Sequence, residues 1–236
     1  MKILAIESSA VTASVAIVED DSVLANYTIN HKKTHSQTLL PMIDEICRMT
    51  ETDVDDLDAI AVSVGPGSFT GLRIGVATAK GIALAKDKPM IPVKTLEALA
   101  YNLYGQIKTI VPIMDAKRKH VYSAIYKFEE GKLVELRETN LISIEDLTKE
   151  LNESYNDVVF LGDGIKVARD YFNENLSINH CEASPLDRLQ DAASLGLRAL
   201  DLAKEEKLVS SDDVKPDYLR PSQAERELAA KKAKNN

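Results

Sequence analysis

The chain has 236 residues, of which 44% are hydrophobic and 28% charged, a composition typical of a soluble globular protein. Its formal net charge of −8 at pH 7 argues against nucleic-acid binding by the chain alone, because such binding depends on clustered lysine and arginine. No apolar run approaches the roughly 20 residues of a membrane span, and Glu7 comes too early for a signal peptide. Cys47 and Cys181 give no disulfide framework, so we expect a cytoplasmic protein without membrane association.

Apolar patterns predict an alternation of strands and helices in the first hundred residues. Strands are expected at residues 2–8, 12–19, 23–30, 60–64 and 90–93. Helices are expected at residues 35–49, 70–85 and 95–104. The strand at 60–64 is a continuous apolar run, which is typical of a strand buried on both faces.

The segment that joins this buried strand to the next helix has the most specific sequence in the chain. Gly65-Pro66-Gly67 predicts a tight turn, because glycine permits a positive φ and proline fixes its own. Ser68 or Thr70 can then cap the helix by accepting a hydrogen bond from a free backbone N–H. An alternative role for the turn is to bind an anion through those N–H groups.

The helix at 70–85 carries small residues every four positions. They are Gly71, Gly75, Ala79 and Ala83. Glycine inside a helix costs about 0.5–1 kcal/mol relative to alanine, so the stripe predicts close approach of the chain's own sheet, a neighbouring helix or a second chain. The side chain of Arg73 is expected to point back toward the sheet, where Glu7 is a candidate charge partner.

The same order of elements starts again near Gly105. Strands at 109–115, 121–128 and 133–141 precede a helix at 144–151 and a strand at 158–161. The first strand of each half ends in a carboxylate, Glu7 or Asp115. Two βββαβα halves describe a duplicated α/β fold of the actin-like (sugar-kinase/Hsp70/actin, ASKHA) type. We expect an N-terminal lobe at 1–105, a C-terminal lobe at 106–215 that includes a long helix at 191–207, and an extended segment with a frayed tail at 216–236.

In actin-like folds the first hairpins of the two lobes face a cleft that holds nucleotide phosphates and a metal. This likeness makes five residues candidates for nucleotide contacts: Glu7, Ser8, Asp115, Gly162 and Gly164. The turn Gly162-Asp163-Gly164 lacks the longer glycine run that is usual at an adenosine pocket. These residues leave open an alternative function as a nucleotide-binding phosphotransferase or ATPase. Titration with ATP and magnesium distinguishes the two functions, because tight binding by the chain alone would favour the enzyme.

Three stretches together resemble the bacterial TsaB (YeaZ) family: residues 3–8, 35–41 and 65–75. The resemblance is strong from residue 2 to about 103 and thinner around Asp115-Ala116 and Tyr122, and Tyr218-Leu219-Arg220 is similar to the family's closing motif. A related glycine motif occurs in the catalytic paralogue TsaD. In TsaD-like enzymes two histidines that bind the catalytic metal follow the strand at 90–93, and Thr95 and Leu99 stand at those positions here.

The resemblance implies a non-catalytic scaffold and activator of a TsaD-type enzyme, which transfers a threonylcarbamoyl group to a tRNA adenosine next to the anticodon. Homodimer and heterodimer would share one surface on the helices at 35–49 and 70–85. The expected partner contacts are His35, Leu39, Ile43, Gly71, Gly75 and Ala79. A TsaE-type ATPase and contact with tRNA only through the complex are further implications. We expect no catalytic residue, no metal and no required cofactor, and the complex interface is a candidate site for ATP or ADP.

Two other hypotheses start from local groups of residues. A glycoprotease-like metallopeptidase would use His31 and His35, but no glutamate or third ligand is placed as in His-Glu-x-x-His. The basic run Lys117-Arg118-Lys119 is expected to be a solvated hairpin tip, with direct contact to tRNA as the alternative.

Overall fold

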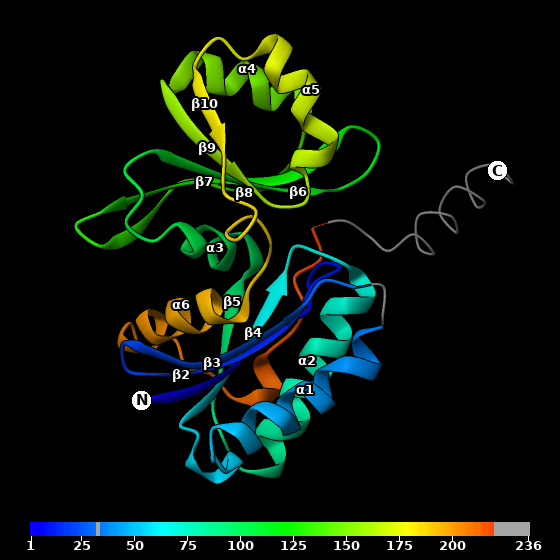
Figure 1. The fold of residues 1–236 in the computed structure, drawn as a ribbon, viewed down its shortest axis with the longest axis vertical. Coiled ribbons are helices and arrows are strands. Elements are labelled where there is room, and N and C mark those ends of the chain that lie inside the picture. The colour runs from blue at the N-terminus through cyan, green and yellow to red at the C-terminus, as the bar shows by residue number, and fades with distance from the viewer. Residues whose placement is uncertain (32–33, 220–236) are drawn as a thin grey trace, which may run out of the picture.

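The computed structural model describes residues 1–31 and 34–219, which form two five-stranded mixed sheets covered by helices (Figure 1). The first sheet consists of β1 (Lys2–Glu7), β2 (Ala13–Glu19), β3 (Ser22–Ile29), β4 (Ala59–Gly65) and β5 (Met90–Lys94). The second consists of β6 (Thr109–Asp115), β7 (His120–Glu129), β8 (Lys132–Ser143), β9 (Asp157–Leu161) and β10 (Asn179–Glu182). None of the helices in these described residues is long and apolar enough to cross a membrane.

The two sheets have the same topology. Their strand orders are β3-β2-β1-β4-β5 and β8-β7-β6-β9-β10. In each sheet the first strand along the chain pairs antiparallel with the second and parallel with the fourth. The duplicated fold predicted from the repeated strand pattern is therefore confirmed.

Helices cover the sheets in layers. The α-helices are α1 (His35–Met49), α2 (Phe69–Ala85), α3 (Thr95–Ala100), α4 (Ile144–Ser154), α5 (Ile165–Asn175) and α6 (Ala192–Lys204). Short 3-10 turns occupy Val54–Asp56, Tyr101–Leu103 and Ser211–Asp213. α1 and α2 pack on one face of the first sheet, α6 packs on its other face, and α4 and α5 cover the outer face of the second sheet. α3 lies between the two sheets (Figure 1).

The position of α6 corrects the predicted domain boundary. The helix at 191–207 was expected in the C-terminal lobe, but Leu195 and Ala199 pack against Ile3 and Ala5 of the first sheet. Gly196 lies so close to β2 that an added Cβ would meet a methyl carbon of Val18 at 2.8 Å. Helical periodicity identifies the apolar side of a helix but does not say which sheet covers it. The chain therefore returns to the first lobe after β10.

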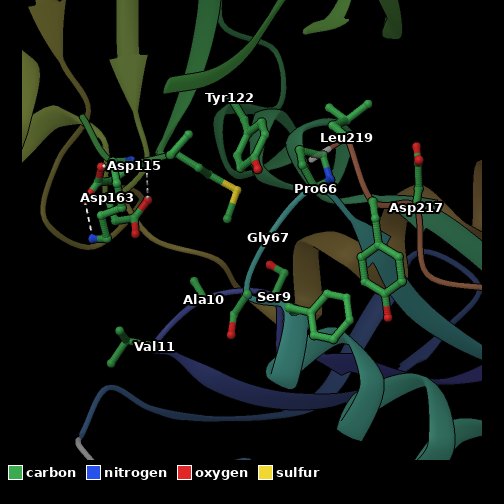
Figure 2. Close-up of a pocket in the computed structure, with 16 residues that line it drawn as sticks. Ser9, Ala10, Val11, Pro66, Gly67, Asp115, Tyr122, Asp163, Asp217 and Leu219 are labelled. Carbon is green, nitrogen blue, oxygen red and sulfur yellow. Dashed lines mark hydrogen bonds and ion pairs between the residues drawn. The ribbon is translucent and has the colours of Figure 1, made fainter. Parts of the chain in front are cut away.

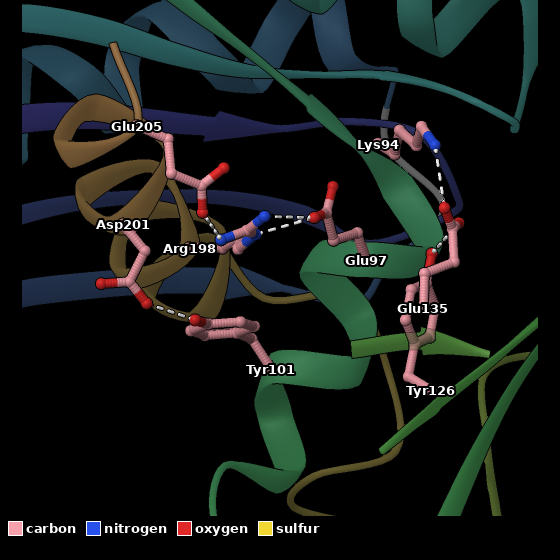
Figure 3. A network of polar contacts seen from close by, with 8 residues as sticks. All are labelled: Lys94, Glu97, Tyr101, Tyr126, Glu135, Arg198, Asp201 and Glu205. Atoms are coloured by element: carbon pink, nitrogen blue, oxygen red, sulfur yellow. Dashed lines mark hydrogen bonds and ion pairs between the residues drawn. The ribbon is translucent and has the colours of Figure 1, made fainter. Parts of the chain in front are cut away.

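Polar contacts join α3 to both sides of the molecule (Figure 3). The buried guanidinium of Arg198 on α6 lies 2.6 Å from the Glu97 carboxylate of α3. The Tyr101 hydroxyl, just after α3, donates a hydrogen bond to Asp201 of α6. On the other side, Glu135 of β8 accepts from Tyr126 and pairs with Lys94 at the end of β5. α3 is thus fixed to α6 and lies against the second sheet.

The apolar pattern of the sequence does not predict α5 or β10. α5 buries only Ile165, Ala168 and Phe172, a short apolar pattern within a charged segment. β10 is a four-residue edge strand with the polar sequence Asn-His-Cys-Glu. Both elements depend on packing and pairing with neighbours, which local patterns report poorly.

Candidate functional site

A cleft lies where the carboxyl ends of β1, β4 and β6 meet between the two sheets (Figure 2). Its volume is about 460 Å³. Ser9–Val11, which follow β1, and the glycine turn from Pro66 to Phe69 line one side. The start of the β6–β7 hairpin with Asp163 lines the other, and residues 217–219 close the mouth. The two first hairpins thus face one another as predicted for an actin-like fold.

Glu7 and Ser8 lie beneath the floor of this cleft. Both are buried, and neither lines the cavity. One Glu7 carboxylate oxygen accepts hydrogen bonds from the Ser9 backbone N–H at 2.6 Å and from the Ser63 hydroxyl at 3.1 Å. Burial raises the pKa of Glu7, and these hydrogen bonds oppose the rise only in part. Glu7 is therefore engaged by its own chain.

The glycine turn packs directly on the residues that follow β1. Ser68 caps α2 as predicted, since its hydroxyl accepts from the Gly71 N–H at 3.2 Å. Cβ atoms added at Gly71 and Gly75 would meet the Ser8 backbone oxygen and hydroxyl oxygen, each at 2.1 Å. Of the three partners proposed for the small stripe, the chain's own sheet approaches it most closely, through Ser8 at the end of β1, and α1 also approaches it, with His35 3.2 Å from an added Cβ at Gly71.

Two carboxylates face the cleft from the second lobe. Asp163 accepts a hydrogen bond from the Asp115 backbone N–H at 3.2 Å, and Asp115 pairs with the Lys117 ammonium at 2.5 Å (Figure 2). Burial, with the nearby charge of Asp115, raises the pKa of Asp163. Asp115 is the only predicted nucleotide contact that lines the cavity in the described part of the chain.

Gly162 and Gly164 have a packing role. An added Cβ would meet the Ile113 backbone oxygen at 2.1 Å from Gly162 and at 2.9 Å from Gly164. Gly162 also has a φ of +104°, which side-chain-bearing residues rarely adopt. These glycines let the turn after β9 lie against the end of β6, and the adenosine contact expected of them stays a prediction.

The C-terminal segment runs along α2 to the mouth of the cleft. The Asp217 N–H donates to the Val64 carbonyl at 2.6 Å. Tyr218 packs on Phe69 with ring centroids 4.5 Å apart, and its hydroxyl accepts from the Arg73 guanidinium at 3.0 Å. The expectation that Arg73 points toward the sheet and Glu7 is wrong, because Arg73 is exposed and its guanidinium lies over the Phe69 ring. The predicted tail beyond residue 219 lies outside the described residues.

The residues expected at the partner surface need correction. Leu39 and Ile43 on α1 and Ala79 on α2 belong to the core beneath these helices, and Gly71 and Gly75 are covered by Ser8. His35 is partly buried, and its imidazole hydrogen-bonds the Ala10 carbonyl at 2.8 Å. Both helices do have exposed sides. Their exposed residues are Ser36, Gln37, Leu40, Pro41, Asp44, Arg48 and Met49 on α1, and Thr70, Arg73, Ala77, Gly81, Leu84 and Ala85 on α2.

The histidines proposed for a metallopeptidase are not gathered into a larger group. Between residues 1–31 and 34–219, no three or more histidine, cysteine, aspartate or glutamate side chains are placed to hold a metal ion. Thr95 and Leu99 are both buried in α3, where Leu99 packs in the apolar cluster shared with the second sheet. The position that follows β5 is thus part of the core between the lobes.

Comparison with known proteins agrees with this geometry. A family model described as TsaD, tRNA N6-adenosine threonylcarbamoyltransferase, matches residues 22–228. A protein of Bacillus subtilis named tRNA threonylcarbamoyladenosine biosynthesis protein TsaB is 32% identical over 95% of this chain and 96% of its own length. The chain belongs to the TsaB (YeaZ) family.

Other matches separate TsaB from its paralogue. A Staphylococcus saprophyticus tRNA N6-adenosine threonylcarbamoyltransferase is 36% identical, but the match covers only 42% of this chain and 34% of that protein. The TsaB likeness is full-length. The solved structure titled YeaZ from Pseudomonas aeruginosa covers 92% of this chain and 99% of its own, with a TM-score of 0.77 and 23% identity, and supports the fold.

Proposed function

We propose that this chain is a non-catalytic subunit in the biosynthesis of threonylcarbamoyladenosine in tRNA, and that it activates a TsaD-type transferase by docking to it. The observation that carries the proposal is the structure of the segment after β5. Where the resemblance places the metal-binding histidines of TsaD-like enzymes, Thr95 and Leu99 are buried in α3. Neither side chain is an imidazole, and Leu99 is committed to the core between the lobes.

The cleft supports the same conclusion. Glu7 is bound by Ser9 and Ser63, and the glycines after β9 are covered by Ile113. Among the described residues, Asp115, Asp163 and Asp217 line the cavity beside one lysine, Lys117. This excess of negative charge repels the phosphates of a nucleotide and so disfavours nucleotide binding by the chain alone. We therefore place any bound ATP or ADP at the interface of the assembled complex.

The exposed sides of α1 and α2 are the proposed docking surface. Leu40 on α1 and Leu84 on α2 are 58% and 61% exposed. Ala77 and Gly81 are also exposed on α2, and their small side chains leave its backbone accessible. An added Cβ at Gly81 would meet nothing within 4 Å, so a partner helix can come close to the backbone there. The same surface on a second copy would give a two-fold homodimer, which the transferase displaces.

Activation by docking requires that this chain bind the active arrangement of the transferase more tightly than other arrangements. In this proposal a TsaE-type ATPase joins the complex, and tRNA is held through the complex rather than by the chain alone. The net charge of −8 fits that division of roles.

Light scattering after size-exclusion chromatography tests the docking surface. We expect the chain alone to be a homodimer and a mixture with the TsaD-type subunit to give a heteromer. Replacing Leu40 and Leu84 together by glutamate should abolish both assemblies, because it buries two charges without partners. Leu186→Glu is the matched control, since Leu186 is 93% exposed and lies in the loop between β10 and α6, away from α1 and α2 in the sequence.

Each variant must keep the circular-dichroism spectrum of the wild type and a cooperative unfolding transition for this comparison to hold, because loss of the dimer by itself lowers the unfolding midpoint. If the Leu40/Leu84 variant forms the heteromer as well as the control does, the docking surface lies elsewhere. If the wild-type chain does not associate with the transferase, the proposed function itself is wrong.

A further inference from the structure

A second groove runs beside the proposed docking surface, between α2 and the C-terminal segment. Its volume is about 500 Å³. The groove is lined by Arg73, Val76, Ala77, Lys80, Val214, Lys215, Pro216 and Tyr218. Three of these residues are cationic, and no described residue that lines the groove carries a carboxylate. The lining of the groove is therefore cationic on a chain whose net charge is −8, with Asp212, Asp213 and Asp217 in the same segment outside the lining.

Arg73 is held in place with part of its hydrogen-bonding capacity unused. Its guanidinium lies 3.9 Å from the centroid of the Phe69 ring, and its Nε donates to the Tyr218 hydroxyl at 3.0 Å. Among residues 1–31 and 34–219 it forms no ion pair. Cation–π contact and one hydrogen bond fix the plane of the group, so a bound carboxylate would cost little further side-chain entropy.

The two lysines extend the positive charge along the groove. The Lys80 ammonium donates to the Val214 carbonyl at 3.0 Å, which holds the end of the side chain beside the C-terminal segment. Lys215 is exposed at the groove edge. Within the described chain, neither lysine is paired with a carboxylate. Both ammonium groups retain donors for an incoming acceptor.

We propose that this groove binds an acidic segment of the TsaD-type partner subunit, with Arg73 taking a carboxylate and Lys80 and Lys215 adding charge around it. The proposal rests on the docking function proposed above. Ala77 belongs both to the groove and to the exposed side of α2, so one partner can cover the two surfaces together.

The floor of the groove favours a protein over an RNA strand. Val76, Ala77, Val214 and Pro216 supply apolar surface, which an acidic peptide covers with its own apolar side chains. A phosphate backbone gains little from such a floor. A planar guanidinium beside a tyrosine ring is typical of the central contacts in protein–protein interfaces.

Zero-length crosslinking of the reconstituted complex tests the proposal directly. A carbodiimide activates a carboxylate, and the neutral amine of a lysine in contact with it then forms an amide while the carbodiimide leaves as a urea. We expect peptides that contain Lys215 or Lys80 to be joined to aspartate or glutamate of the transferase subunit. Lys132, an exposed residue at the β7–β8 hairpin, is the matched control and should give no such link.

Affinity measurements with charge variants give an independent readout. Lys215→Glu should weaken binding to the transferase subunit about tenfold at low salt, and the gap from wild type should narrow as salt rises. Lys132→Glu should bind as wild type does. Lys215 is exposed and is not part of the Phe69–Tyr218 ring contact that holds the C-terminal segment on α2. We therefore expect Lys215→Glu to keep the folded state.

Three results would overturn the proposal. An intact complex without Lys215 or Lys80 crosslinks, and with unchanged affinity in Lys215→Glu, would show that the groove is not part of the interface. Weakened tRNA binding by the assembled complex, with unchanged subunit affinity, would assign the groove to RNA. Failure of the wild-type subunits to associate would remove the proposed function and this inference with it, and only that result affects both.

Discussion

Glu7 shows how the environment of one residue decides its chemistry. A carboxylate at the end of the first strand could serve a nucleotide site, but here it is buried beneath the cleft and bound by Ser9 and Ser63. Burial raises its pKa in the folded chain above the ordinary value of 4.5, and the charge of Asp191 acts in the same direction. The folded protein therefore retains this proton to higher pH than the unfolded chain does.

The raised pKa predicts how stability depends on pH. The contribution of protonated Glu7 is fully present below its unfolded pKa and is lost as the pH rises through its folded pKa. Glu7→Gln keeps an oxygen that can accept both hydrogen bonds and has no charge to bury. Urea unfolding between about pH 5 and about pH 9 should show a smaller loss of stability with rising pH in this variant.

The pKa of Asp163 is also raised, and this residue is present in both the wild type and Glu7→Gln. Its contribution to the pH dependence of stability is therefore the same in the two proteins. Only the difference between the two curves belongs to Glu7. Parallel curves for wild type and Glu7→Gln would contradict the account of the buried carboxylate.

Helix α2 is the element around which the first lobe is built. Its small residues permit close contact with Ser8, and Ser68 caps its first turn. The C-terminal segment packs along the helix, where Lys80 donates a hydrogen bond to the Val214 carbonyl. The sequence pattern predicts the strand, the turn, the cap and the helix, because each depends on nearby residues. It leaves open what approaches the glycines, since a close contact with any of three partners requires the same small side chains.

Two alanine substitutions on α2 separate close packing from helix propensity. Gly71→Ala should lower the free energy of unfolding by about 2 kcal/mol or more, because its Cβ would meet a backbone oxygen of Ser8. Gly81→Ala should raise it by about 0.5–1 kcal/mol, because the site is open and alanine favours the helix. Chemical denaturation measures both at a protein concentration low enough for the chain to be monomeric, so that no second copy covers Gly81. Equal effects of the two substitutions would contradict the packing described for α2.

Elements that depend on distant packing were the hardest to predict. The sequence pattern identifies α1 and α6 as helices but does not identify what covers their apolar sides. It predicts that a partner chain covers Leu39 and Ile43 of α1 and that α6 belongs to the second lobe, and both predictions are wrong. Leu39 and Ile43 face the chain's own sheet, and Leu195 packs on β1. Periodicity identifies the buried side of a helix, and the exposed side that meets a partner has to be found from the fold.

At the scale of the whole molecule, two lobes of one topology have different outer surfaces. The first lobe presents α1, α2 and the C-terminal segment, with exposed leucines and a cationic groove. The network of Glu97, Tyr101, Arg198 and Asp201 fixes α3 between the lobes. This arrangement suits a subunit that presents a firm surface to a partner, and the cleft itself is lined by an excess of carboxylates.

The duplication and the family were predicted from the sequence for a simple reason. Both rest on short patterns that local residues determine: apolar strands that end in Glu7 or Asp115, and the glycine motif from Gly65 to Arg73. The cationic groove was not predicted, because Arg73 and Lys215 are far apart in the chain and meet only after the C-terminal segment has returned to α2.

A reconstituted transfer assay tests the central claim most directly. Threonylcarbamoyl-adenylate, tRNA, ATP and the TsaE-type ATPase would be supplied to the TsaD-type subunit while this chain is titrated in, and modified adenosine would be measured. We predict negligible transfer by the chain alone, and a rate that rises with added chain and levels off at equal amounts of the two subunits. Transfer by the chain alone, or a rate that the chain leaves unchanged, would contradict the account.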